Sequence, residues 1–166
     1  MAQDDRQLPV LLVIGIGNDY RHDDAAGLLV ARRLKGLNIP DVRIVESDGQ
    51  PPRLLELWHD ASMVIVIDAV SSGAAPGTIH WFDLEQEGVP ADLVQISSHG
   101  LGVAQAIELA RALGRVPAKI KLFGIEGKNF EQGEGLTPEV AESIPAVVSC
   151  VRETLHDLMN ERAAHA

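Results

Sequence analysis

Acidic side chains and one histidine stand at positions of this chain where they could share a metal ion. Asp23 and Asp24 follow an apolar run, Asp68 ends another, and His99 precedes a helical pattern. Carboxylates in a small space raise one another's pKa unless a positive charge neutralises them, and a metal ion commonly supplies that charge. Two carboxylates and one imidazole suit zinc, nickel, iron or manganese rather than copper(I). We therefore expect a metal site if folding brings these groups together.

Each of these residues also has a purely structural explanation. Asp23 and Asp24 can both cap a helix, although one carboxylate is enough for this and the other is left to face a crevice. Asp68 can form a turn, yet a charge at the end of a buried strand is costly unless it is paired. His99 can be an incidental residue at a helix start. Taken one at a time, these residues do not decide between the two explanations.

For other polar residues, the sequence gives less support for a functional role. Asp48 and Glu126 also follow strand patterns, but Asp48-Gly49 is a common turn dipeptide and Glu126 can be a solvated strand end. Surface positions without partners are expected for the remaining histidines, which are His22, His59, His80, His156 and His165.

The elements that must position these groups alternate between strands and helices. Strand patterns cover residues 10–16, 42–46, 63–67, 78–83 and 119–125, and helical patterns cover residues 23–37, 51–58, 100–113 and 138–162. The stretch between residue 83 and Ser97 is expected to be loosely structured. This alternation predicts an α/β fold, a three-layer α/β/α sandwich around a mostly parallel, twisted sheet of about five strands. Residues 78–83 alternate like an edge strand, which can run antiparallel. In such a sheet, ligands bind beyond the carboxyl ends of the strands.

Bulk composition restricts the class of protein. The 166 residues fit one domain over residues 1–166, with 46% hydrophobic and 23% charged residues. A net charge of −10 argues against a nucleic-acid partner, and no apolar run is long enough for a membrane-spanning helix. The single cysteine, Cys150, excludes an internal disulfide and favours a cytoplasmic location.

The glycine-rich turn after the first strand does not fit a nucleotide site. A dinucleotide fingerprint that starts at Gly15 and Gly17 needs a third glycine where Tyr20 stands, and the nearby carboxylates would repel a pyrophosphate. The chain also lacks a P-loop and a Gly-x-Ser-x-Gly elbow, and Cys150 has no base near it in the sequence. For a hydrolytic reaction, a metal ion therefore remains the expected source of catalytic power.

These motifs together resemble the hydrogenase maturation endopeptidases, which remove a C-terminal extension from the large subunit of nickel–iron hydrogenases. The opening motif of that family is similar to Gly15-Ile16-Gly17-Asn18 followed by Asp23-Asp24-Ala25-Ala26-Gly27. The later motifs are similar to Ser47-Asp48-Gly49, Val66-Ile67-Asp68-Ala69, Pro76-Gly77-Thr78, Ser98-His99-Gly100-Leu101 and Gly135-Leu136-Thr137-Pro138-Glu139-Val140. The resemblance covers nearly the whole chain in the same order.

The resemblance implies that Asp24, Asp68 and His99 are the catalytic residues and the three metal ligands. It implies that the metal is nickel carried by the substrate precursor, and that other divalent metals can substitute for it. Three protein ligands leave coordination positions open for the substrate or a water. The residues do not identify the general base, for which Asp23 and Glu126 are spare candidates.

The resemblance also implies a partner and a reaction. The partner is a nickel-loaded hydrogenase large-subunit precursor, the reaction is metal-dependent endoproteolysis near its C-terminus, and no nucleotide takes part. Substrate contacts are implied for Gly15, Gly17, Asn18, Asp48 and Gly49. The alternative is a non-catalytic nickel- or zinc-binding module, such as a metallochaperone, on the same fold.

Overall fold

Runs of apolar and β-branched residues form a five-stranded sheet in the computed structural model of this chain, which describes residues 10–84 and 89–165. The first nine residues, residues 85–88 and residue 166 of the predicted domain lie outside the described residues. The strands are β1 (Val10–Ile16), β2 (Val42–Ser47), β3 (Ala61–Val70), β4 (Ile79–Asp83) and β5 (Lys119–Glu126). Their order in the sheet is β2-β1-β3-β5-β4. The pairs β1–β2, β1–β3 and β3–β5 are parallel, and edge strand β4 runs antiparallel to β5, which confirms the predicted sheet.

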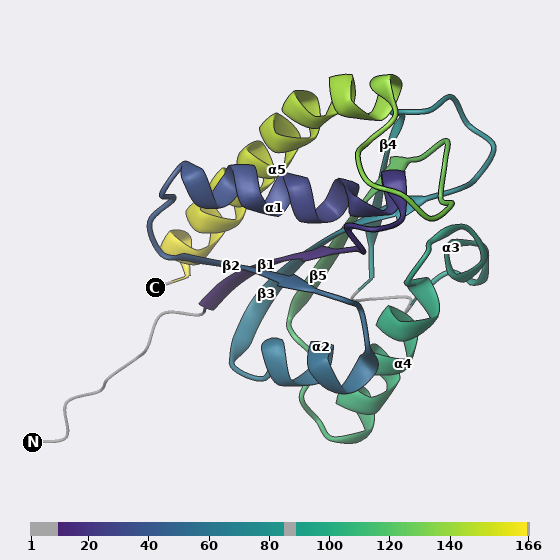
Figure 1. Ribbon diagram of the computed structural model, residues 1–166. Coiled ribbons are helices and arrows are strands. Elements are labelled where there is room, and N and C mark those ends of the chain that lie inside the picture. Colours follow the sequence, from purple (N-terminus) through teal and green to yellow (C-terminus); the bar gives the residue numbers. More distant parts are fainter. Residues whose placement is uncertain (1–9, 85–88, 166) are drawn as a thin grey trace, which may run out of the picture.

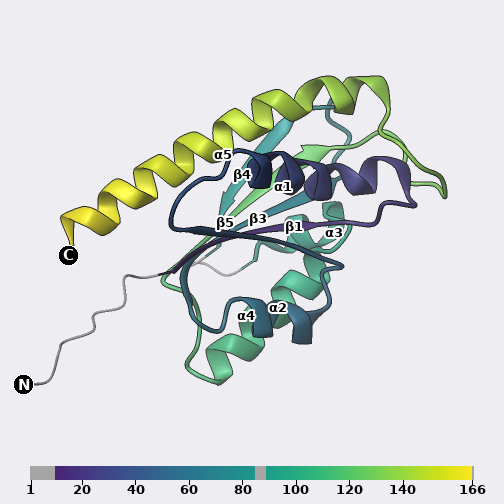
Figure 2. The same cartoon turned by 60° about the vertical axis from the view of Figure 1, so that its left-hand side comes forward.

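Helices cover both faces of the sheet. They are α1 (Ala26–Gly36), α2 (Pro51–Leu57), α3 (Ala91–Ile96), α4 (Gly100–Ala112) and α5 (Pro138–Ala164), and a short 3₁₀ helix, η1 (His22–Ala25), precedes α1. Figures 1 and 2 show α1 and α5 on one face and α2 and α4 on the other. The predicted three-layer α/β/α sandwich is confirmed. No helix within the described ranges is long and apolar enough to cross a membrane.

The central strand β3 contributes to a separate core on each face of the sheet. Val64 and Val66 pack into the cluster beneath α2 and α4, whereas Ile65 and Ile67 pack into the cluster beneath α1 and α5. Side chains of a strand alternate between faces, so a strand covered on both sides must be apolar at every position. This burial explains the unbroken apolar run in the sequence.

The structure differs from the predicted elements at three places. The predicted helix over residues 23–37 begins with η1, and regular α-helix starts only at Ala26. Strand β3 continues to Val70, so Asp68 lies inside the strand rather than after it. Helix α3 lies in the stretch expected to be loosely structured, and its six residues are too few to give a clear helical period.

Helix α1 lies unusually close to the ends of β1 and β3. A Cβ atom on Gly27 would lie 2.3 Å from the carbonyl oxygen of Ile67 and 2.4 Å from that of Ile16. Gly27 itself lies over Gly15, where a Cβ atom would be 2.4 Å from the Gly27 carbonyl oxygen. Only glycine permits such an approach, and it brings the start of α1, with η1 before it, onto the carboxyl edge of the sheet.

Candidate metal centre

Asp24, Asp68 and His99 come together at the carboxyl edge of the sheet. Asp24 belongs to η1, Asp68 to β3, and His99 immediately precedes α4. One possible ligand atom from each residue lies within 4.8 Å of the other two. The structure therefore brings together the three residues that were predicted to hold a metal, while their role as ligands stays a prediction.

The carboxylate of Asp68 is buried and accepts hydrogen bonds on both oxygens. Oδ2 accepts from the Ser97 hydroxyl at 2.6 Å and from the His99 backbone N–H at 3.2 Å. Oδ1 accepts from the Ala69 N–H at 2.9 Å and lies 3.0 Å from Nδ1 of His99. Asp68 thus fixes both the backbone and the ring of His99, and these bonds let a charged group stay inside the strand.

The orientation of His99 follows from its contact with Asp68. Where the Asp68 carboxylate accepts this contact, Nδ1 of His99 is the donor, and in the neutral imidazole Nε2 then has its lone pair free. Nε2 lies 3.8 Å from Oδ2 of Asp24, and the His99 side chain is 19% exposed. A His–Asp pair also occurs in serine hydrolases, but here Nε2 faces a carboxylate and, within residues 10–84 and 89–165, hydrogen bonds to no hydroxyl group. This arrangement suits metal coordination better than activation of a serine.

Asp24 is the unusual member of the group. It is 1% exposed, and neither of its carboxylate oxygens has a hydrogen-bond partner among the described residues. Burial raises the pKa of Asp24 and the charge of Asp68 adds to this, whereas the His99 imidazole and the nearby Ser98 hydroxyl group, which is not within hydrogen-bond geometry, oppose it. Buried carboxylate oxygens without donors are costly, and a divalent cation would satisfy them. The residues present therefore fit a metal ion.

The charges around His99 also favour a bound cation. Burial disfavours the protonated imidazole, but the hydrogen bond to Asp68 and the charges of Asp68 and Asp24 outweigh it and raise the pKa of His99. The two carboxylates thus attract a positive charge to the position between them. A metal ion at Nε2 would supply that charge in place of a proton.

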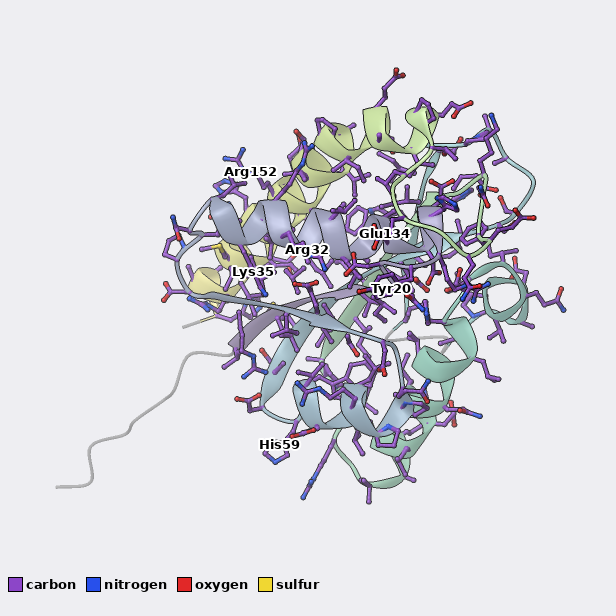
Figure 3. All side chains as sticks on the ribbon, in the orientation of Figure 1. Tyr20, Arg32, Lys35, His59, Glu134 and Arg152 are labelled. Carbon is purple, nitrogen blue, oxygen red and sulfur yellow. The ribbon has the colours of Figure 1, made fainter. Side chains whose placement is uncertain are left out.

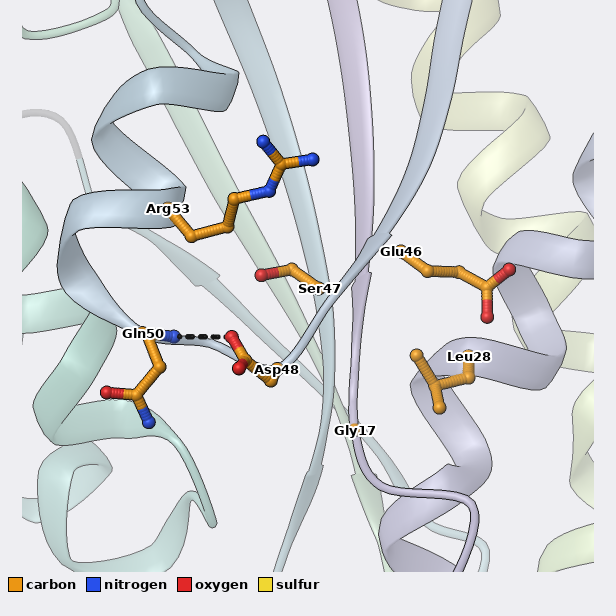
Figure 4. Close-up of a pocket in the computed structure, with 7 residues that line it drawn as sticks. All are labelled: Gly17, Leu28, Glu46, Ser47, Asp48, Gln50 and Arg53. Atoms are coloured by element: carbon orange, nitrogen blue, oxygen red, sulfur yellow. Dashed lines mark hydrogen bonds between the residues drawn. The ribbon is translucent and has the colours of Figure 1, made fainter.

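A groove leads away from His99 and is formed by two adjoining cavities of about 450 Å³ and 530 Å³. Both cavities are lined by Gly17, Leu28, Asp48 and Gln50. The first cavity also reaches Asn18, Tyr20 and His99, and the second reaches Glu46 and Arg53. Figure 4 shows Arg53 and Gln50 on the α2 side of this second cavity and Leu28 on the α1 side. We call this feature the Asp48 groove.

One rim of the Asp48 groove is fixed by Arg32 of α1, which is labelled in Figure 3. Its guanidinium donates to the two carboxylate oxygens of Asp19 at 2.9 and 2.8 Å, and to Glu46 at 2.9 Å. The hydrogen bonds from Arg32 hold the pKa of Asp19 below its ordinary value. Exposed pairs of this kind add little stability, so their effect here is to orient the rim.

The predicted substrate contacts divide into two groups. Gly17, Asn18 and Asp48 line the Asp48 groove, as a substrate contact requires. Gly15 and Gly49 line neither cavity, and a substrate contact for these two residues stays a prediction. Gly15 is buried beneath Gly27. Gly49 has a φ of +80° and lies against His99, where a Cβ atom on Gly49 would be 2.9 Å from the Cβ atom of His99. Both glycines serve close packing. Gln50 and Arg53, which follow the Asp48-Gly49 turn, also line the groove and were not among the predicted substrate contacts.

Asp23 and Glu126, the spare candidates for a general base, are both engaged elsewhere. Each is buried, at 0% and 2% exposure, and each accepts hydrogen bonds from four donors. The donors to Asp23 come from residues 128–137, and those to Glu126 come from Ser72, Gly73 and His80. Both carboxylates are thus bound by donors within the protein, and the alternative that Glu126 is a solvated strand end is wrong. A role of either residue as general base stays a prediction.

Two of the histidines expected at the surface have partners distant in sequence, and a third, His165, has its Nδ1 2.7 Å from the carbonyl oxygen of Glu161 in the preceding helical turn. His80 Nε2 lies 3.0 Å from Glu126, and its side chain is 22% exposed. His22 Nδ1 lies 2.9 Å from the carbonyl oxygen of Gly135. Both partners are distant in sequence, which is why the pattern gave no sign of them. The other three, His59, His156 and His165, are exposed as predicted.

Low pH should lower the free energy of unfolding of this protein, partly because Glu126 becomes protonated. Burial raises the pKa of Glu126, but the hydrogen bonds from Ser72, His80 and Gly73 outweigh it and hold this pKa below its ordinary value. The resulting stabilisation is complete above the ordinary glutamate pKa of about 4.3 and is lost as the pH falls through the lowered folded-state value. We expect Glu126→Gln to lower the free energy of unfolding by about 3 kcal/mol at pH 7 and by clearly less near pH 3. Urea titrations of both proteins at several pH values would measure this; a pH-independent difference would contradict it.

Comparison with known proteins identifies the family. Residues 28–154 match the family model HycI, hydrogenase maturation protease. This chain belongs to the hydrogenase maturation protease family. It is 34% identical over 163 residues to the hydrogenase 2 maturation protease of Escherichia coli K12, and the match covers 93% of this chain and 98% of that protein. It is 32% identical over 149 residues to the hydrogenase expression/formation protein HupD of Rhodobacter capsulatus, and the match covers 86% of this chain and 70% of that protein.

Solved structures of the hydrogenase maturation proteases have the same fold. The hydrogenase maturating endopeptidase HybD from E. coli superposes with a TM-score of 0.76 at 31% identity, over 89% of this chain and 92% of that one. HybD from Thermococcus kodakarensis superposes with a TM-score of 0.71 at 25% identity, over 87% of this chain and 97% of that one. These matches confirm the predicted family, fold class and endopeptidase activity. Within the hydrogenase maturation protease match, Asp68 and His99 are included, whereas Asp24 lies just before it.

Proposed function

We propose that this hydrogenase maturation protease removes the C-terminal extension of a nickel–iron hydrogenase large-subunit precursor. In this proposal the nickel ion is part of the substrate, because the precursor carries it into the site. Asp24, Asp68 and His99 contact that ion, and the cut is made beside it. The names of the relatives, which refer to hydrogenase maturation, support this choice of substrate.

The observation that carries the proposal is the pair of buried oxygens on Asp24, which lie opposite the Asp68–His99 pair and have no hydrogen-bond partner in the described part of the chain. Carboxylate oxygens and the free Nε2 of His99 are suitable ligands for nickel, and three protein ligands leave positions open for groups of the substrate. A metal ion bound there would polarise the scissile carbonyl or a water molecule.

The other residues of the site have supporting tasks. Asp68 holds the His99 ring so that Nε2 faces Asp24. The Asp48 groove takes the extended polypeptide next to the scissile bond, with Asn18 near His99 and Arg53 at the far end. Fixing both the ion and the peptide would align the carbonyl with its attacking group, which is the main advantage of a preorganised site.

The test compares a nickel-loaded precursor with the same precursor prepared without nickel. We expect the loaded precursor to lose a short C-terminal peptide, which intact-protein mass spectrometry would detect, and the nickel-free precursor to stay whole. Removal of nickel from the loaded precursor with a chelator should protect it. Equal cleavage of both forms would overturn the role of nickel, and binding without cleavage would favour the metallochaperone alternative.

A further inference from the structure

Asp23, the residue next to Asp24, ties two distant segments of the chain together. Its carboxylate accepts from the backbone N–H groups of Lys128 at 2.8 Å, Asn129 at 2.9 Å and Thr137 at 2.8 Å. The hydroxyl group of Thr137 lies 3.0 and 2.9 Å from its two oxygens. These bonds outweigh the effect of burial and lower the pKa of Asp23. All four donors belong to the loop between β5 and α5, so Asp23 does not cap its own helix.

Backbone hydrogen bonds join the same two segments. The N–H of Asp23 donates to Asn129 at 2.9 Å, the N–H of His22 donates to Gly133 at 2.9 Å, and Gly133 donates back to Tyr20 at 2.9 Å. Figure 3 shows Tyr20 and Glu134 at the same end of α1. His22 has a φ of 44°, an unfavourable value for a residue with a side chain, so the surrounding contacts must hold this turn in place.

The position of Asp24 depends on this turn because, among residues 10–84 and 89–165, no hydrogen bond fixes its side chain. Its carboxylate points toward His99 only if the backbone of η1 keeps its place. Below the turn, a Cβ atom on Gly17 would lie 2.2 Å from the Asp24 carbonyl oxygen, so the residue that follows β1 supports the backbone closely on that side. On the other side, the bonds of Asp23 with residues 128–137 provide the restraint.

We propose that Asp23 is a positioning residue for the metal centre. By binding the loop between β5 and α5, it holds η1 so that Asp24 faces Asp68 and His99. It acts through Asp24 and does not touch the metal or the substrate. This inference rests on the proposed function, since it takes Asp24 as a metal ligand. Side chains that orient metal ligands commonly change metal affinity by about 10- to 100-fold when they are replaced.

The test uses two matched variants of the full chain, Asp23→Asn and Glu126→Gln. Both carboxylates are buried, both accept from four donors that are distant in sequence, and both variants keep the size of the side chain. We expect similar falls in melting temperature. Calorimetric titration with Ni²⁺ alone should show an affinity about 10- to 100-fold weaker for Asp23→Asn and within about twofold of the original protein for Glu126→Gln. The visible absorption spectrum of bound Co²⁺ should change only for Asp23→Asn.

Each result has a clear meaning. Equal losses of affinity in both variants, or an unchanged affinity in Asp23→Asn, would overturn the role of Asp23 and leave the metal site in place. If the unaltered protein binds no Ni²⁺, or if Asp68→Asn binds it equally well, Asp24, Asp68 and His99 do not form a metal site in the free protein and the positioning role of Asp23 fails. The proposed cleavage of a precursor that carries its own nickel is judged separately, by the mass spectrometry of the loaded and nickel-free precursors. Thr137→Val removes only one donor to Asp23, the hydroxyl group of residue 137, and it replaces Asp23→Asn as the test variant if Asp23→Asn does not fold. It should weaken Ni²⁺ binding in the same direction by a smaller factor.

Discussion

Replacing His99 with alanine is expected to reduce cleavage of the nickel-loaded precursor by at least about 1,000-fold. The variant loses the Nε2 that faces Asp24 and leaves Asp68 with one hydrogen bond fewer. The fold should persist, because Asp68 keeps its bonds to Ser97, Ala69 and the backbone of residue 99. The rate would be followed by mass spectrometry of the precursor, and the fold by circular dichroism and melting temperature.

His80 offers a matched control for this experiment. Like His99, it lies 3.0 Å from a buried carboxylate, and the two side chains are 22% and 19% exposed. His80→Ala should therefore cost a similar amount of stability, yet keep cleavage within about threefold of the original rate, since small local changes away from a site leave the chemistry intact. Comparable activity losses in both variants would mean that His99 acts only through stability, and the assignment of the metal centre would be wrong.

The sequence predicted the arrangement of the site because the relevant positions are tied to strand ends. Asp24 and Asp68 follow or end apolar runs, and parallel strands bring their carboxyl ends to one edge of the sheet. His99 precedes a helix that returns from the same edge. The topology therefore brings the three residues to one edge of the sheet, and the resemblance to the family singled them out from the other acidic residues expected there.

The different surroundings of Asp23 and Asp24 could not be predicted from the sequence in the same way. Both were possible helix caps, and the structure shows that neither caps its helix with its side chain. The partners of Asp23 are more than 100 residues away in sequence, in a loop without hydrophobic periodicity. The bonds of Glu126 to the residues after β3 are equally non-local. Hydrogen bonds of this kind depend on tertiary structure, which local patterns of residues do not encode.

The close contact of α1 with the sheet leads to the largest expected effect on stability. Gly27→Ala would place a methyl group 2.3 to 2.4 Å from two backbone carbonyl oxygens, of Ile67 and Ile16, which belong to paired strands and cannot move independently. We expect the free energy of unfolding to fall by about 3 kcal/mol and the melting temperature by roughly 10 °C. Thermal and urea unfolding of the variant would measure both quantities.

Gly36, in the same helix, is the control for this substitution. A Cβ atom on Gly36 meets nothing within 4 Å, so Gly36→Ala adds no clash and removes the flexibility of a glycine in the helix. It should raise the free energy of unfolding by about 0.5 kcal/mol, opposite in sign to the effect of Gly27→Ala. The opposite signs separate the close approach of α1 to β1 and β3 from the general effect of adding a methyl group to this helix. If Gly27→Ala were as stable as the original protein, α1 would have to lie farther from the sheet, and Asp24 could not then be held beside Asp68 by this packing.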